Sequence, residues 1–361
     1  MRYYIIVGES SGDLYGGLLM QQLIKKDSDA QFLFWGGPEM KKHASAQVKS
    51  LEETAFMGFW EVAKNAFKIR ELFRYAKSSV LKFQPHIIIF IDYPGFNLRM
   101  MKWAKAQNFR TCFYISPQLW AWKRKRHLLL KEYADLFFVI LPFEKNFYKN
   151  LDTPCIYHGH PILELIKMEG SFQRKNKTVG LFPGSRTQEI EKHFGLLKQF
   201  AQQNPSLKFL VAGVNHVNEN IYRNDIKNIE ILYDSKEKIM KEAELAIASS
   251  GTATLELALY GVPQIVIYKT SALSYAIGKR LVKTRFISLV NIIAEHKIVD
   301  ELLQENFNLE ELKNSFDKLN DPNARTKILN AYSNLRKKLG DGHTSEKVAQ
   351  DIINYLKKPK D

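Results

Sequence analysis

Short, continuous runs of apolar residues recur along the whole chain, and longer helical stretches separate them. Runs of this kind are typical of parallel strands covered on both faces, and parallel strands need crossover connections that are usually helices. The pattern therefore predicts an α/β fold. The runs of the first half are Tyr3–Val7, Phe32–Trp35, Ile87–Ile91, Thr111–Ile115, Leu136–Leu141 and Cys155–His158. Those of the second half are Val179–Phe182, Phe209–Ala212, Ile229–Tyr233, Leu245–Ala248 and Gln264–Tyr268.

The two series are separated by a polar stretch without periodicity, between Leu165 and Thr178, where we expect the domain boundary. The expected domains are two doubly wound, Rossmann-like ones, residues 1–165 and 178–340, followed by a C-terminal helix in residues 341–361. Such domains bind ligands at the carboxyl ends of their strands, so we expect them to face a shared cleft. The sequence leaves open whether the last helix returns to the first domain or packs on a partner chain in a homodimer.

Two matched turns in the second half each follow a strand-like run and open a helix. They are Pro183-Gly-Ser-Arg186 and Ser250-Gly-Thr-Ala-Thr254. Glycine and small hydroxyl residues at a helix N-terminus let an anion approach free backbone N–H groups. Arg186 lies in the first turn and Glu256 beyond the second, so the pair of turns suits a nucleotide diphosphate. Arg186 can bind the diphosphate, and the Glu256 carboxylate can accept hydrogen bonds from the ribose hydroxyls. The candidate residues are Ser185, Arg186, Ser250, Gly251, Thr252, Thr254 and Glu256.

The first turn of the chain, Val7 to Gly16, has glycines at a spacing of four and four, so the dinucleotide fingerprint G-x-G-x-x-G is not met. A second substrate can still lie close to its backbone. The alternative is a tight turn in which Ser11 or Asp13 caps a helix. The candidate binding residues here are Gly8, Glu9, Ser11, Gly12 and Asp13.

Asp92 stands at the carboxyl end of the aliphatic run Ile87–Ile91, and Asn97 follows in the same turn. A carboxylate held by a rigid strand beside an apolar pocket can have its pKa raised enough to act as a general base. The equally weighted alternative is a strand-end cap that bonds its own loop. We select Asp92 as the candidate base and Asn97 as a candidate binding residue.

The formal net charge of +15 indicates an anionic partner. Basic residues from Lys123 to Arg126 follow Trp120 and Trp122 at a strand end, where a phosphate-bearing substrate is a better partner than a polymer.

Region 56–83 combines an apolar, aromatic face with lysines and arginines, which indicates either an interfacial helix or an ordinary amphipathic helix packed on the sheet. No stretch reaches the ~20 apolar residues of a membrane-spanning helix. His158 and His160 lack further ligands at metal spacing, so neither a metal nor a cofactor is expected.

Together these segments resemble the lipid-A-disaccharide synthase family, inverting glycosyltransferases of the GT-B type with two Rossmann-like domains. The ordered set is far more specific than any one block. The matching blocks are Gly8–Asp13, Met57–Val62, Tyr114–Trp122, Leu141–Glu144, Gly159–Pro161, Pro183–Arg186, Ser250–Glu256, Arg280–Thr284, Ser288–Asn291 and Glu301–Gln304.

The resemblance implies that UDP-2,3-diacylglucosamine and 2,3-diacylglucosamine 1-phosphate react to give lipid A disaccharide 1-phosphate and UDP. For this reaction we assign Asp92 as the base, and Arg186 with the helix N-terminus at Gly251 as the groups that stabilise the leaving diphosphate. Glu256, Asn291 and Gln304 are assigned to the nucleotide. The family pattern usually has a second carboxylate where this chain has Gly95, which favours Asp92. It also implies a cytoplasmic enzyme held peripherally at the cytosolic face of the inner membrane of a Gram-negative bacterium.

Two rival functions remain at this stage. One is a GT-B transferase or epimerase acting on a soluble UDP-N-acetylhexosamine, which has no use for an apolar, basic region 56–83. The other is nucleic-acid binding, suggested by the charge alone; it leaves the paired glycine turns unexplained, and we expect no nucleic-acid partner. If Asp92 is not the base, His158 and His160 are the next candidates.

Overall fold

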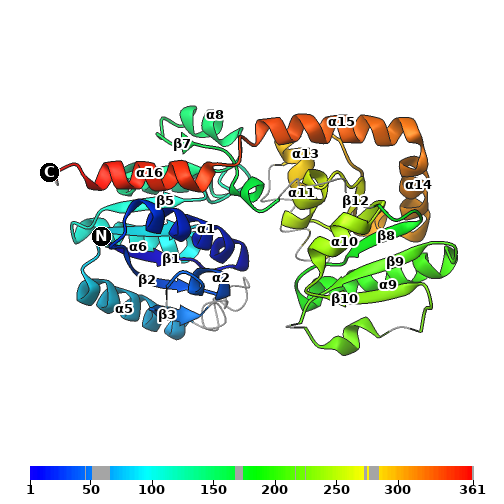
Figure 1. Ribbon diagram of the computed structural model, residues 1–361, viewed down its shortest axis with the longest axis horizontal. Coiled ribbons are helices and arrows are strands. Elements are labelled where there is room, and N and C mark those ends of the chain that lie inside the picture. The colour runs from blue at the N-terminus through cyan, green and yellow to red at the C-terminus, as the bar shows by residue number, and fades with distance from the viewer. Residues whose placement is uncertain are drawn as a thin grey trace. The chain divides into compact units, whose positions relative to one another are not determined.

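The computed structural model describes residues 1–44, 46–50, 66–166, 174–215, 217–223, 225–271, 275 and 284–359. Contacts divide the chain into two compact units: the first unit is residues 1–165 with 339–361, and the second unit is residues 166–338. The sequence blocks at 57–62 and 280–283, and the first part of the expected basic helix, lie outside the described residues. In Figure 1 the two units are coloured by residue number.

The first unit holds a parallel sheet of seven strands in the order β3-β2-β1-β4-β5-β6-β7. Its strands are β1 Arg2–Ile6, β2 Gln31–Gly36, β3 Gln47–Ser50, β4 Ile87–Ile91, β5 Thr111–Tyr114, β6 Leu136–Val139 and β7 Ile156–Tyr157. Its helices are α1 Ser10–Lys26, α2 Pro38–Lys41, α5 Ala66–Phe83, α6 Pro94–Ala106, η1 Arg124–Arg126, α7 His127–Tyr133, α8 Glu144–Lys149, η2 Pro161–Glu164 and α16 Thr344–Leu356. The order reverses between β1 and β4, which is where doubly wound sheets bind ligands.

The second unit repeats this arrangement in a parallel sheet of six strands, ordered β10-β9-β8-β11-β12-β13. Its strands are β8 Thr178–Phe182, β9 Lys208–Gly213, β10 Ile229–Tyr233, β11 Leu245–Ser249, β12 Gln264–Tyr268 and β13 Glu301–Leu303. Its helices are α9 Thr187–Gln203, η3 Glu219–Tyr222, α10 Lys236–Glu242, α11 Thr252–Leu259, α13 Leu289–Ala294, η4 Gln304–Asn306, α14 Leu309–Asn320 and α15 Pro322–Lys338. Here the order reverses between β8 and β11. The predicted fold class is confirmed.

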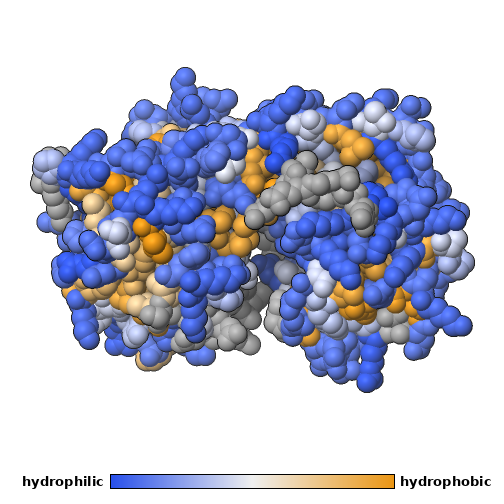
Figure 2. Space-filling view, in the orientation of Figure 1, coloured by the Kyte–Doolittle hydropathy of each residue, from blue (hydrophilic) through white to orange (hydrophobic). Residues whose placement is uncertain are grey.

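Each sheet has its own apolar core because its central strands are buried on both faces. All five residues of β4 and of β8 are buried. On the face drawn in Figure 2 the surface is mostly hydrophilic, and hydrophobic residues show only in separate patches.

Helix α5 settles one of the open sequence interpretations. Ala76 and Val80 are fully buried, Phe83 packs against the core of the first unit, and Phe73 stacks on Phe96 with ring centroids 4.3 Å apart. The face expected at a membrane interface is thus packed on the sheet, as in an ordinary amphipathic helix. The exposed apolar residues of α5 lie elsewhere on it, with Phe67 exposed to 76%.

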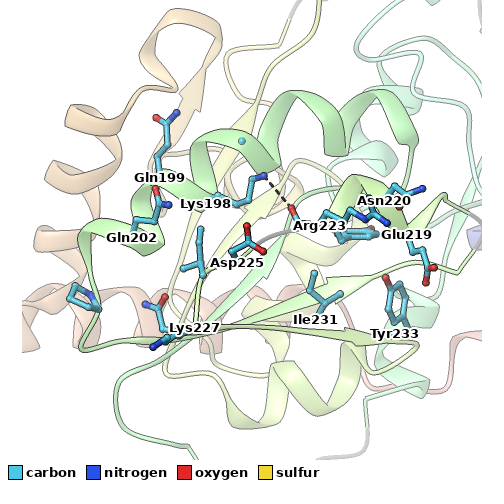
Figure 3. A pocket seen from close by; sticks show the side chains of 15 residues that line it. Lys198, Gln199, Gln202, Glu219, Asn220, Arg223, Asp225, Lys227, Ile231 and Tyr233 are labelled. Atoms are coloured by element: carbon cyan, nitrogen blue, oxygen red, sulfur yellow. Dashed lines mark hydrogen bonds between the residues drawn. The ribbon is translucent and has the colours of Figure 1, made fainter.

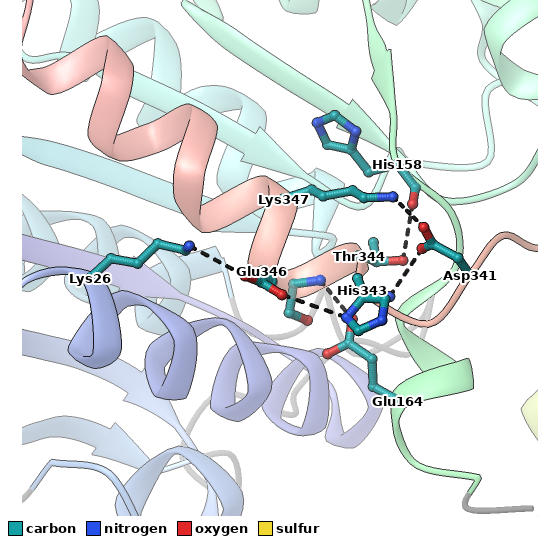
Figure 4. Close-up of polar contacts among 9 residues, drawn as sticks. Lys26, His158, Glu164, Asp341, His343, Thr344, Glu346 and Lys347 are labelled. Atoms are coloured by element: carbon teal, nitrogen blue, oxygen red, sulfur yellow. Dashed lines mark hydrogen bonds and ion pairs between the residues drawn. The ribbon is translucent and has the colours of Figure 1, made fainter.

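The last helix, α16, runs beside α1 of the same unit, red against blue in Figure 1. Its apolar side is buried, with Ile352 fully inaccessible. Polar contacts fix its N-terminus (Figure 4): the Ser345 N–H donates to the Glu164 carboxylate at 2.6 Å, and the Thr344 hydroxyl donates to the His158 carbonyl at 3.3 Å. An ion pair of 3.5 Å between Lys26 and Glu346 joins α16 to the end of α1.

Candidate active site

The loops that follow β1 and β4 meet at the point where the first sheet reverses its strand order. Gly8 lies against the Tyr93 ring, so closely that a Cβ added to Gly8 would lie 2.1 Å from a ring carbon. Asp92 and Tyr93 both have left-handed backbones, with φ of 47° and 52°. Consecutive non-glycine residues in this region are strained, and such strain is found mostly at functional sites.

Asp92 is half-buried at the end of β4. Its N–H donates to the Tyr114 carbonyl of β5 at 3.1 Å, which fixes its backbone. Burial, and then the charge of Glu9, raises the pKa of the Asp92 carboxyl from 3.8 to about 7. A carboxyl group with a pKa near neutrality, on a rigid strand end, has the properties of a general base.

Asn97 lies in the first turns of α6 and is fully buried. Its side-chain amide donates to the Asp92 carbonyl at 2.8 Å and to the Ile6 and Ile91 carbonyls at 3.3 Å. It therefore ties the ends of β1 and β4 together beneath the candidate base. Sequence reasoning placed Asn97 as a binding residue, whereas these contacts make it a residue that positions the Asp92 loop.

Around α1, the candidate residues divide by exposure. Glu9 is exposed, Ser11 is half-buried, and Gly12 and Asp13 are buried. The Asp13 carboxylate accepts three backbone N–H groups at the start of α2, from Gly37 at 2.7 Å, Glu39 at 2.9 Å and Met40 at 3.1 Å. Asp13 is thus a cap, as the alternative interpretation held, although of α2 and not of its own helix.

In the second unit, the loops after β8 and β11 flank the reversal of strand order. Ser185 and Arg186 are exposed, and the Arg186 guanidinium lies 3.8 Å from the Glu189 carboxylate. Gly251 and Thr252 are also exposed, and a Cβ added to Gly251 would meet nothing within 4 Å. No neighbouring atom therefore requires a glycine at this position. The space beside the backbone at the N-terminus of α11 is open.

Several other candidates in this unit are engaged within the protein. Ser250 donates its hydroxyl to the Ile287 carbonyl at 2.8 Å, and Thr254 donates to the Gly251 carbonyl at 2.8 Å. The Glu256 carboxylate is paired with Lys236, whose ammonium lies 2.7–2.8 Å from its two oxygens. A ribose contact through Glu256 would therefore have to share this carboxylate with Lys236.

Asn291 and Gln304 are buried and serve the loops around β13. The Asn291 amide donates to Val299 and Glu301 at 2.9 Å and accepts from Ile298 and Val299 at 2.7 and 3.0 Å, so its hydrogen-bonding capacity is filled. Gln304 accepts from the Thr270 N–H at 2.7 Å and donates back to its carbonyl. These contacts hold loops in place and leave Asn291 nothing to offer a nucleotide.

His193 of α9 was missed by the sequence reasoning. It is fully buried, bonds the Pro183 carbonyl at 2.6 Å and accepts from the Lys269 N–H at 2.9 Å. It thus connects the loop after β8 to the end of β12. Burial lowers its pKa, which keeps the imidazole neutral for these two bonds. A histidine seven residues into a helix gave no sign of this in the sequence.

The two histidines considered as alternative bases are occupied. His158 bonds Asp351 of α16 at 2.7 Å. His160 is buried, accepts from the Ile162 N–H at 3.1 Å, and burial lowers its pKa to about 3. Within the described part of the chain, no three His, Cys, Asp or Glu side chains gather as a metal site would require.

A hollow of about 1460 Å³ lies beside the edge strand β10 of the second unit (Figure 3). Its lining is largely polar; Lys198 of α9 donates across it to the Arg223 carbonyl at 3.3 Å. None of the predicted site residues lines it, and neither does any residue of the loops after β8 and β11.

Among the helices that the structure describes, none has the length together with the apolar composition of a membrane-spanning segment.

Two doubly wound parallel sheets, each with candidate residues where its strand order reverses, define the GT-B class of glycosyltransferase architecture. Solved structures agree in fold: UDP-GlcNAc 2-epimerase from Neisseria meningitidis bound to UDP-GlcNAc has a TM-score of 0.65 at 14% identity, covering 98% of this chain and 100% of that one. The spinosyn rhamnosyltransferase SpnG has a TM-score of 0.61 at 13% identity, with the same coverages.

Sequence comparison identifies the family. A family model described as lipid-A-disaccharide synthetase matches residues 3–352. The lipid-A-disaccharide synthase of Geobacter sulfurreducens is 31% identical over 99% of this chain and 98% of the relative, and that of Coxiella burnetii is 31% identical over 98% of each. The chain belongs to the lipid-A-disaccharide synthase family and is a glycosyltransferase.

Proposed function

We propose that this enzyme joins UDP-2,3-diacylglucosamine to 2,3-diacylglucosamine 1-phosphate, with inversion, to give the β-1,6-linked lipid A disaccharide 1-phosphate and UDP. Family membership over nearly the whole chain supports the reaction. The observation that carries the mechanism is the Asp92 carboxyl, with its pKa raised to about 7 at the strand-order reversal of the first unit. The epimerase alternative rests on structures of 14% identity, which share the fold alone.

In the proposed mechanism the first unit activates the acceptor. The Asp92 carboxylate takes the proton of the acceptor 6-hydroxyl as that oxygen attacks the anomeric carbon of the donor. The bond between that carbon and the diphosphate oxygen breaks at the same time, and its electron pair stays with UDP. UDP departs from the face of the sugar opposite to the attacking oxygen. Asn97 holds the Asp92 carbonyl through its 2.8 Å bond and so fixes the direction of the base.

The second unit receives the nucleotide. The exposed Arg186 supplies a positive charge that stabilises the negative charge developing on the leaving diphosphate. The open space at Gly251 lets a phosphate reach the N-terminus of α11. Ser185 and Thr252 are exposed at the same two turns and are proposed as further contacts. Asn291 and Gln304 are proposed to shape the surrounding loops. This assignment needs no metal to neutralise the leaving group.

Both substrates carry acyl chains and phosphate, so the enzyme is proposed to work peripherally at the cytosolic face of the inner membrane of a Gram-negative bacterium. The net charge of +15 supports attraction to an anionic leaflet, where each nearby Lys or Arg contributes about 1 kcal/mol.

The test is UDP release in detergent micelles with both acylated substrates. Wild-type enzyme should release UDP only when the acylated acceptor is present. Asp92→Asn should lower kcat by about 10²–10⁴-fold while UDP still binds, because only the proton transfer is lost. Asp317→Asn, an exposed aspartate of α14, is the matched control and should keep the wild-type rate.

The pH profile supplies a second readout of the same assignment. Since the base works deprotonated, wild-type kcat/KM should fall about tenfold per pH unit below pH 7. Full rate in the Asn variant, or a profile flat down to pH 5, would exclude Asp92 as the base. UDP release with a non-acylated acceptor would move the enzyme to the soluble-sugar alternative.

A further inference from the structure

Two cations of the first unit, Lys123 and Arg126 in the segment that follows β5, lie close to one indole. A third cation, Arg99 on α6, is near enough for its charge to act on both of them. The Lys123 ammonium lies 4.4 Å from the centroid of the Trp122 ring, and the Arg126 guanidinium carbon lies 5.9 Å from it. The neighbouring Arg124 points elsewhere, to the Phe147 ring at 5.5 Å. We call Arg99, Lys123 and Arg126 the basic triad.

Among the residues that the structure describes, no carboxylate neutralises the charges of the triad. Burial, then the charges of Arg126 and Arg99, lowers the pKa of Lys123, and burial followed by Arg99 lowers that of Arg126. In the described residues no carboxylate forms an ion pair with any of the three, whereas Lys105 and Lys131 of the same unit pair with Asp135 and Asp152. Like charges held together without a counter-ion attract an anionic ligand.

The segment that leads to two of the triad residues is packed within the first unit. Lys123 has a left-handed backbone with φ of 51°, which is unfavourable for a lysine. Upstream, Ser116 and Tyr148 share a buried hydrogen bond of 2.5 Å, and the Trp120 and Phe143 rings pack edge to face at 5.3 Å. The Glu144 carboxylate is buried and accepts the Ile140 and Leu141 N–H groups. These contacts hold residues 116–120, directly upstream of the strained turn, against Phe143 and α8.

The triad lies on segments that follow the carboxyl ends of β4 and β5, and the candidate base directly follows β4. β4 and β5 are adjacent, and the Asp92 N–H is bonded to the last residue of β5. Helix α6 begins two residues after Asp92, and Arg99 lies five residues into it, about 8 Å along the helix axis. The triad and the candidate base therefore lie on segments that follow the same two neighbouring strands.

We propose that the basic triad, with Trp122, binds the phosphomonoester of the acceptor sugar. This inference rests on the proposed function and extends it to a residue set for the acceptor. Two guanidinium groups and an ammonium match the several oxygens of a phosphomonoester dianion, and arginine binds phosphate in bidentate geometry. The Trp122 ring, over which Lys123 and Arg126 both lie, holds these two cations close to each other.

The experiment measures binding directly, so that it does not depend on turnover. Isothermal titration calorimetry in detergent micelles compares 2,3-diacylglucosamine 1-phosphate with the same lipid lacking its phosphate. Wild-type enzyme should bind the phosphorylated lipid about ten- to hundredfold more tightly. Arg99→Gln and Arg126→Gln should each remove most of that preference and leave binding of the dephosphorylated lipid unchanged. Lys125→Gln, an exposed neighbour outside the triad, is the matched control and should keep the preference.

The outcomes separate the triad from the reaction and from the membrane. A wild-type preference abolished in the triad variants supports the inference even if UDP release fails, in which case the proposed function alone is lost. No wild-type preference, or a preference that survives in both variants, overturns it. Sedimentation with phosphatidylglycerol vesicles is the second arm: variants that lose vesicle binding but keep the phosphate preference would assign the triad to phospholipid headgroups and overturn the proposal.

Discussion

A carboxyl group whose pKa is raised by its surroundings reduces the stability of the fold that raises it. At about pH 3 and below, the Asp92 carboxyl is protonated in both the native and the unfolded chains. Between its unfolded pKa of 3.8 and its native pKa of about 7, only the native state keeps the proton, so the free energy of unfolding falls as pH rises. Above pH 7 the cost is complete.

Asp92→Asn should therefore be more stable than wild type at pH 8, by about 1–4 kcal/mol, and equal to it at about pH 3. Urea unfolding of both proteins at intervals between about pH 3 and pH 8 measures the difference. Asp317→Asn should follow wild type throughout. A constant difference between the Asn variant and wild type at every pH would show that the Asp92 pKa is not raised.

The candidate base could be found from sequence because a polar residue directly after an aliphatic run needs no knowledge of distant partners. The fate of Asp13 could not, because its three partners lie more than twenty residues away at the start of α2. The same holds for Asn291, whose amide is filled by residues 298–301. A motif shows which polar groups are present, while only the folded loops show which of them remain open to a ligand.

At the scale of elements, the strands marked by apolar runs were predictable, and two strands at sheet edges, β3 and β13, were not. The predicted bounds of β4 and β12 agree with the structure because apolar runs mark them, and those of the edge strand β10 agree as well. β3 is polar Gln-Val-Lys-Ser, and β13 has only three residues, so neither has a pattern of its own. Both become strands because a neighbouring strand offers them hydrogen bonds. For α5, periodicity revealed the apolar face but not what covers it.

The contact between the loops after β1 and β4 gives a prediction at this scale. Gly8→Ala must displace the Tyr93 ring, since the new Cβ would lie within 2.1–2.6 Å of three ring carbons. We expect a loss of about 1–3 kcal/mol in stability and, because Tyr93 adjoins Asp92, a fall in kcat of about 10²-fold with little change in UDP affinity.

The matched control is Gly195→Ala, on the exposed side of α9, where an added Cβ meets nothing within 4 Å. There the same substitution should stabilise the helix by about 0.5–1 kcal/mol and leave kcat unchanged. Chemical denaturation and steady-state UDP release measure both effects. Wild-type kcat in Gly8→Ala would mean that the Tyr93 ring does not fix the direction of the base.

At the scale of the whole molecule, the first unit is completed by the last helix of the chain. Ile352 of α16 is fully buried against it. Ile352→Ser should lower the stability of the first unit by about 2–4 kcal/mol and leave the second unit unaffected. In differential scanning calorimetry only the transition of the first unit should move. Asn354→Ser, on the exposed side of α16, is the control; an equal shift in both variants would refute the docking seen here.

The return of α16 also affects how the protein is made. The ribosome releases α1 first and α16 more than three hundred residues later, a delay on the order of tens of seconds at usual rates of synthesis. During that time the outer face of α1 lacks its cover, while the second unit, which is one continuous stretch of chain, emerges whole. The domain synthesised first is thus the one that finishes folding last, and translation that stalls before Thr344 leaves it unfinished.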